Sequence, residues 1–125
     1  MIAYLRGEDG ADIVERHLQD DSEPCVAHAV NVCEVYYKAV RRSGVGAANS
    51  AIQDLRDQGL VVREDLDEAF WQDVGFHKAR MSWLPLADCF VVALATRLDA
   101  AAVTTEHEDF DRVSEHSLCR VEFIR

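Results

Sequence analysis

The sequence predicts an α/β fold, a three-layer α/β/α sandwich with a parallel sheet, because strands and helices alternate along the chain. Short apolar stretches that read as strands are separated by amphipathic helical patterns. These strand stretches are continuously apolar, which is typical of strands buried on both faces of a parallel sheet. The 125 residues contain no repeat and no linker. We therefore expect a single domain over residues 1–125.

The N-terminal half is mostly helical in pattern. Pro24 separates the first helical region from a short buried strand, and Ser43-Gly44 and Gly59 are expected to end helices. We expect helices at 2–7 and 9–18, a strand at 25–30, and helices at 31–42 and 47–58.

In the C-terminal half, helices and strands alternate more evenly. Asp65 or Asp67 is expected to cap a long amphipathic helix, and Pro85 suits the first turn of a very apolar one. We expect a strand at 60–63, helices from 65 or 67 to 81 and at 85–98, a strand at 101–104, a short helix at 107–114 and a last strand at 120–124.

Composition indicates an ordinary globular protein, with 49% hydrophobic and 29% charged residues. The longest apolar run, Cys89 to Ala95, is too short to cross a bilayer, and no signal peptide is evident, so we expect a cytoplasmic protein. The four cysteines are scattered, and we expect them to be reduced. A zinc site that combines them with His28, His107 or His116 would lack ligand-like spacing.

The net charge of −10 argues against binding nucleic acid through a broad basic surface. A narrow path of cations would be needed instead. Its candidates, each of which could equally be a solubilising charge, are Arg6, Lys38, Arg41, Arg42, Lys78 and Arg80.

Three acidic residues interrupt apolar runs. Glu34 follows the strand at 25–30, Glu106 follows the strand at 101–104, and Asp88 lies at the start of an apolar helix. Sites in open parallel sheets form outside the carboxyl ends of the strands, so these carboxyl groups are expected within about 10 Å of one another. Two carboxylates about 4 Å apart repel by about 4 kcal/mol at an effective dielectric of about 20. A divalent ion with a preference for hard oxygen ligands, Mg²⁺ or Mn²⁺, would offset this repulsion.

Each acid also has a structural explanation. Asn31 and Glu34 fit the spacing of a capping box, in which Asn31 caps the helix and Glu34 reaches back to its first amide. Asp88 would interact favourably with a helix dipole. Asp109 and Asp111 are either further metal ligands or N-terminal charges of a short helix, and His107 is expected in a solvated turn. Thr104 would orient Glu106 through its hydroxyl group or cap the following turn.

The order of these stretches resembles the PIN domain family of metal-dependent nucleases, and most closely VapC-type toxins of toxin–antitoxin pairs. The resemblance rests on Ala3 to Gly10, His28 to Tyr36, Leu86 to Ala95, Val103 to Glu106 and Val121 to Ile124. It implies an endoribonuclease in which Glu34, Asp88 and Glu106 hold Mg²⁺ or Mn²⁺, with an RNA substrate and a cognate antitoxin as partners. Glu106 departs from the family, where an Asp is usual.

The family's first, central strand and its catalytic Asp are absent from this sequence, which begins within the following helix. The resemblance places that strand between the strands at Val26 and Val103. Either the protein starts upstream of Met1, or the gap is filled by rearrangement or by strand exchange between subunits. Without that Asp, the chain is expected to be an impaired ribonuclease. An alternative function also follows, in which the chain is an inactive PIN-fold scaffold that binds RNA or protein.

Large aromatic residues occur at helical spacing and are expected in the core or in the interface of a symmetric homodimer. Base stacking by one of them is a further interpretation. The residues expected at the interface are Tyr36, Tyr37, Phe70, Trp71 and Trp83.

Overall fold

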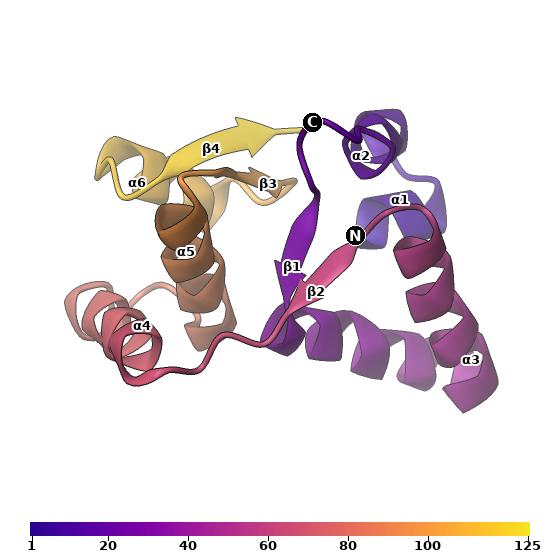
Figure 1. Cartoon of the computed structure of the whole chain (residues 1–125), viewed down its shortest axis with the longest axis horizontal. Helices are drawn as coiled ribbons and strands as arrows, with labels where there is room; N and C mark the ends of the chain where they lie inside the picture. Colours follow the sequence, from indigo (N-terminus) through magenta and orange to yellow (C-terminus); the bar gives the residue numbers. More distant parts are fainter. The chain divides into compact units, whose positions relative to one another are not determined.

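A computed structural model describes all residues from Met1 to Arg125. The chain forms two compact units: unit 1 comprises Met1–Arg63 together with Arg125, and unit 2 comprises Glu64–Ile124. Each unit combines helices with one pair of parallel strands (Figure 1). The predicted α/β class with parallel strands is thus confirmed. The single domain over residues 1–125 stays a prediction.

Unit 1 holds the first five elements of the chain. They are α1 (Ile2–Arg6), α2 (Ala11–Leu18), β1 (Val26–His28), α3 (Ala29–Asp57) and β2 (Val61–Arg63). β1 and β2 pair in parallel, with Val26 opposite Val61. Val14, Val35 and Leu55 are among the buried residues that hold the helices of this unit together.

Helix α3 has two arms, which meet at an angle (Figure 1). Gly44 separates them with φ 86° and ψ 171°, a backbone conformation that glycine adopts without the steric cost of a Cβ atom. The break predicted at Ser43-Gly44 is therefore confirmed. We call residues 29–43 the first arm and residues 45–57 the second arm.

Gly59 brings the end of α3 against the end of α2. Its φ is +119°, and a Cβ atom built there would lie 2.1 Å from the backbone oxygen of Leu18. No side chain fits at this position, so the sequence must place a glycine here for the two helices to approach. The glycine that was predicted as a helix stop is also a packing requirement.

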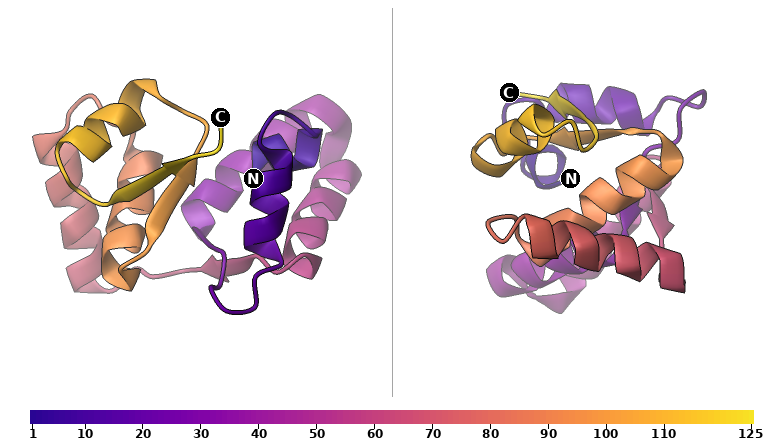
Figure 2. Two further views of the ribbon diagram at one scale, coloured as in Figure 1. Left: turned by 90° about the horizontal axis from the view of Figure 1, so that it is seen from above. Right: turned by 90° about the vertical axis from the view of Figure 1, so that its left-hand side faces the viewer.

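Unit 2 holds the remaining elements. They are α4 (Glu68–Arg80), α5 (Leu86–Leu98), β3 (Ala101–Thr104), α6 (Glu108–Glu115) and β4 (Arg120–Phe123). β3 and β4 pair in parallel, with Ala102 opposite Val121. Figure 2 shows α5 beneath this strand pair and α4 on the far side of α5. Phe70, Leu84 and Val92 are almost completely buried in this unit.

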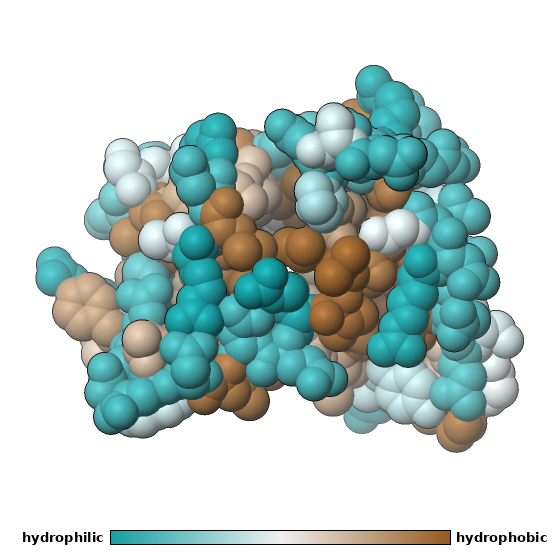
Figure 3. Space-filling view, in the orientation of Figure 1, coloured by the Kyte–Doolittle hydropathy of each residue, from teal (hydrophilic) through white to brown (hydrophobic).

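The strands form two separate two-stranded sheets, and no strand of the chain pairs with both β1 and β3. Hydrophilic residues cover most of the face drawn in Figure 3, and apolar residues are exposed between them. None of the helices combines the length with the apolar character that crossing a bilayer requires.

Candidate functional site

Glu34 lies on the first arm of α3 and is half-buried. The predicted capping box of Asn31 and Glu34 is wrong, because the helix begins at Ala29 rather than at Asn31. His28 is the N-cap, and its Nδ1 accepts a hydrogen bond from the backbone N–H of Val30 at 3.1 Å. Asn31 therefore lies inside the first turn, 8% exposed. Glu34 is not needed to cap this helix, which removes its structural explanation.

The cap at His28 also explains why β1 is shorter than the predicted strand at 25–30. The strand ends at His28, and the helix begins directly after it without a loop. His28 is only 2% exposed. Histidine is not among the residues that usually cap helices, so the sequence carried no signal for this cap.

Asp88 lies in the first turn of α5, half-buried. Its backbone N–H donates to the carbonyl oxygen of Pro85 at 3.0 Å, and Pro85 occupies the N-cap position just before the helix. The next residue, Cys89, is completely buried. Asp88 is therefore carried on a helix that is fixed by the core, a placement that suits both a metal ligand and a charge interacting with the helix dipole.

Glu106 lies in the turn between β3 and α6. Its Oε2 accepts a hydrogen bond from the backbone N–H of Asp109 at 3.0 Å, so one carboxylate oxygen helps to cap α6. The hydroxyl oxygen of Thr104 accepts a hydrogen bond from the backbone N–H of Glu106, also at 3.0 Å. Thr104 thus fixes the backbone of Glu106 rather than its carboxylate. The carboxylate is held by α6 and keeps Oε1 for another ligand.

Asp109 and Asp111 both lie in the first turn of α6, where negative charges are stabilised by the helix dipole. His107 precedes this helix. Its ring stacks on Phe123 with the centroids 4.3 Å apart, and its Nδ1 lies 3.5 Å from Oδ1 of Asp111. The predicted turn position of His107 is confirmed, and the stacking on Phe123 is an additional packing role.

The donor chemistry of these acids fits a magnesium or manganese ion, because all of them offer hard carboxylate oxygens. Glu34 belongs to unit 1, whereas Asp88, Glu106, Asp109 and Asp111 belong to unit 2. Within either unit, no three histidine, cysteine, aspartate or glutamate side chains form a group that could hold a metal ion. The convergence of Glu34, Asp88 and Glu106 accordingly stays a prediction.

The cysteines do not form a zinc site within either unit. All four are free thiols. Burial raises the pKa of the Cys25, Cys89 and Cys119 thiols, which keeps them protonated. Because zinc binds the thiolate form, these residues are better described as small core and near-surface side chains.

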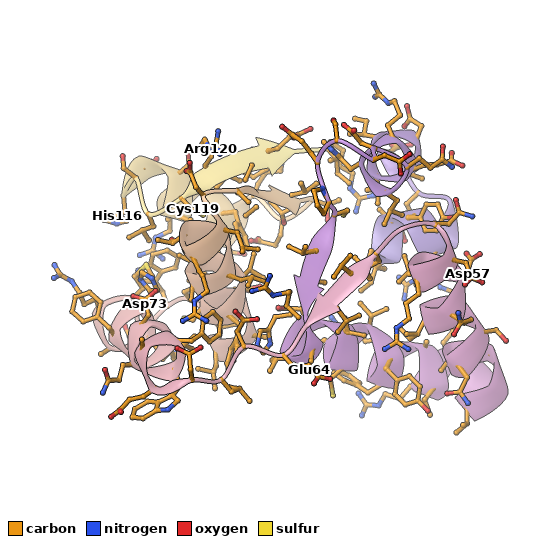
Figure 4. The ribbon with its side chains drawn as sticks, viewed as in Figure 1. Asp57, Glu64, Asp73, His116, Cys119 and Arg120 are labelled. Atoms are coloured by element: carbon orange, nitrogen blue, oxygen red, sulfur yellow. The ribbon has the colours of Figure 1, made fainter.

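Two hollows in unit 2 lie away from the predicted acids. One, of about 530 Å³, lies between α4 and α5 and is lined by Asp73 and Phe76, among others. The other, of about 480 Å³, lies beside the start of β4 and is lined by Cys119 and Arg120, among others. Figure 4 labels Asp73, Cys119 and Arg120 in these two regions. Neither hollow contains Asp88 or Glu106.

Sequence reasoning missed an ion-pair cluster at the start of α4. Arg97 on α5 donates to both carboxylate oxygens of Asp67, at 2.6 and 2.7 Å, and to Asp65 at 2.9 Å. The hydrogen bonds from Arg97 lower the pKa of Asp67. Asp67 occupies the predicted N-cap position of α4 but makes no side-chain capping bond there. No sequence pattern indicates that Arg97 would pair with Asp67, which lies thirty residues earlier in the chain.

The family model of the PIN domain matches residues 1–116. No curated protein matches the chain.

Proposed function

Because the chain belongs to the PIN domain family, a family with a nuclease fold, we propose that it is an endoribonuclease that hydrolyses RNA phosphodiesters with Mg²⁺ or Mn²⁺. The family match over residues 1–116 carries this proposal. The positions of the acids support it: Glu34 follows β1 closely in the sequence, Glu106 follows β3, and Asp88 starts α5. The carboxyl ends of parallel strands are where α/β folds bind ligands.

In this proposal, Glu34, Asp88 and Glu106 hold the ion, and Asp109 and Asp111 supply further negative charge. When bound, such an ion lowers the pKa of a water molecule and offsets the charge that develops on the phosphate. The chain contributes rigid ligands. Glu106 is held through Thr104 and the amide of Asp109, and Asp88 through the buried helix α5. Ligands fixed in this way need no reorganisation when RNA binds.

We further propose a toxin-like role, with a cognate antitoxin protein as partner and a homodimer as the assembly. The order of the motifs, which resembles VapC-type toxins, supports the toxin-like role. For the dimer, Trp71 remains a candidate because it is 50% exposed, whereas Phe70, at 2%, belongs to the core. Sedimentation at micromolar concentration tests the dimer, and a 14.0 kDa species over a tenfold dilution would rule it out.

The nuclease proposal is tested by cleavage of a fluorescently labelled single-stranded RNA with Mn²⁺ or Mg²⁺ present. We expect cleavage by the wild-type chain that EDTA abolishes, and a loss of about 100-fold or more in Asp88→Asn, since even groups that only support metal ligands cost 10–100-fold. Glu115→Gln, at an exposed position on α6, is the matched control and should cleave normally. Absence of cleavage by the wild-type chain, with RNA still bound, would favour the inactive scaffold.

A further inference from the structure

The first arm of α3 carries positive charge in a strongly acidic chain. The protein has 23 acidic residues and 13 lysine and arginine residues, yet no acidic residue occurs between Glu34 and Asp54. Lys38, Arg41 and Arg42 all lie in this interval. Positive charge concentrated in this way, on one helix of a chain with net charge −10, creates a local field opposite in sign to that of the whole protein.

These cations share a helix face with a candidate metal ligand and an aromatic ring. Tyr37, Lys38 and Arg41 follow Glu34 by three, four and seven residues, a spacing that places all four on one side of an α-helix. Tyr37 is 41% exposed. The Lys38 Nζ and the Arg41 Cζ lie 6.0 and 5.9 Å from the centre of its ring. We call Tyr37, Lys38 and Arg41 the α3 basic face.

The cations of the α3 basic face are available for a ligand. Neither Lys38 nor Arg41 forms an ion pair with a carboxylate of unit 1, whereas other arginines of the unit do. Arg6, for example, pairs with Glu8 at 3.5 Å. One candidate for a cation path in unit 2 is engaged by hydrogen bonds: the Lys78 Nζ donates to the carbonyl oxygens of Ser82 and Leu84.

We propose that the α3 basic face binds single-stranded RNA, with the Tyr37 ring stacking on a base and Lys38 and Arg41 contacting phosphates. The inference rests on the proposed function, because the bound strand would lead toward Glu34. At a rise of about 1.5 Å per residue, Arg41 lies about 10 Å from Glu34 along the helix axis. This face therefore contacts nucleotides that neighbour the cleaved bond.

The combination of an exposed ring with flanking cations selects the kind of ligand. Phosphates alone would need only the lysine and the arginine, and an acidic peptide would gain little from an exposed tyrosine. Bases that can stack on a side chain are those of unpaired strands, because the bases of a duplex are stacked on one another. Stacking of this kind tolerates any base, so the face would contribute affinity and position rather than sequence specificity.

The test measures binding of a labelled oligouridine of about 12 nucleotides by fluorescence anisotropy, in EDTA so that no cleavage occurs. Lys38→Gln/Arg41→Gln should lower the slope of log affinity against log salt by about 1.4, because each phosphate contact on a single strand contributes about 0.7. Tyr37→Ala should weaken binding by about 10- to 100-fold without changing that slope, and Tyr37→Phe should restore it.

Arg56→Gln is the matched control. It removes the same charge from an exposed position on the second arm of α3, where Asp54 and Asp57 lie nearby in the sequence, and should change neither affinity nor slope. An equal loss in Arg56→Gln, an unchanged slope in Lys38→Gln/Arg41→Gln, or displacement of the RNA by polyglutamate with no effect of Tyr37→Ala would each overturn the inference.

The inference and the nuclease proposal fail separately. If RNA binds through the α3 basic face but is never cleaved with Mn²⁺, the inference stands and the nuclease proposal fails. If RNA is cleaved while Lys38→Gln/Arg41→Gln binds it with unchanged affinity and slope, the nuclease proposal stands and the inference fails.

Discussion

Arg97 in unit 2 and the cations of the α3 basic face in unit 1 are engaged in different ways. In unit 2, Arg97 is held by the carboxylates of Asp65 and Asp67. On the first arm of α3, in unit 1, Lys38 and Arg41 form no ion pair with a carboxylate of that unit and lie near the Tyr37 ring. Cations that are already paired stabilise a fold, whereas unpaired cations on an exposed face attract a ligand.

The acidic residues predicted to bind the metal are distributed between the two units in the opposite way, with most of them in unit 2. Unit 1 contributes only Glu34, whereas unit 2 contributes Asp88, Glu106, Asp109 and Asp111. Under the proposed function, unit 2 supplies most of the metal ligands and unit 1 supplies most of the contacts to RNA. This division suggests experiments in which each unit is changed separately.

The largest effect is expected from the acids. We expect Glu34→Gln in unit 1 and Asp88→Asn in unit 2 each to lower RNA cleavage by about 100-fold or more. If both acids hold one ion, the double variant should lose little more than either single variant, because the effects of residues that act as a unit are not additive. Initial cleavage rates with Mn²⁺ measure all three. A double variant with the product of the two losses, about 10⁴-fold, would show that the acids act independently.

The next largest effect concerns the backbone of unit 1. Gly59→Ala places a Cβ atom 2.1 Å from the Leu18 oxygen at a φ of +119°, so the backbone must move. The strained φ alone costs about 1–3 kcal/mol, and displacing the end of α2 adds to it. Denaturant unfolding followed by far-UV circular dichroism should show a large drop in the midpoint. A midpoint within error of wild type would show that α2 and the end of α3 do not approach as described.

The same substitution in unit 2 should have the opposite sign. Gly75 lies within α4, and a Cβ atom there meets nothing within 4 Å. Because alanine favours a helix interior over glycine, Gly75→Ala should stabilise the chain by about 0.5–1 kcal/mol. Tryptophan fluorescence reports on unit 2, because Trp71 and Trp83 are the chain's two tryptophans. Destabilisation by Gly75→Ala would mean that this side of α4 is packed against another surface.

Most of the secondary structure could be predicted from the sequence, because local patterns determine it. The strand at Ala101–Thr104 and the apolar helix that ends at Leu98 match the prediction. The predictions differ from the structure where contacts between distant parts of the chain determine the local conformation. The cap at His28 moved the start of α3 by two residues, and Asp67, the N-cap residue predicted for α4, binds Arg97 through its carboxylate.

The candidate site could likewise be predicted only where local sequence patterns determine it. The positions of Asp88 in the first turn of α5 and of Glu106 just after β3 followed from the apolar runs around them. The hydrogen bond from Asp109 to Glu106, by contrast, depends on the conformation of one turn, and no residue pattern specified it. The face shared by Glu34 and Arg41 was not predicted, although it follows from their separation of seven residues, because a continuous helix converts sequence separation directly into direction.

The smallest effect is expected from the ion pairs of unit 2. Arg97 lowers the pKa of Asp67 through its hydrogen bonds, so Asp67 binds a proton more readily in the unfolded chain than in the folded one. Its contribution to stability is therefore complete above the unfolded pKa of about 3.9 and is lost as the pH falls through the lower, folded value. Arg97→Gln should reduce this loss, so that the thermal unfolding midpoint falls less between pH 5 and pH 3 than in wild type. Arg80→Gln, which removes the same charge from a residue without a carboxylate partner in unit 2, is the control. An identical acid dependence in wild type and Arg97→Gln would show that the pairing of Arg97 with Asp67 contributes nothing in solution, as is common for exposed pairs.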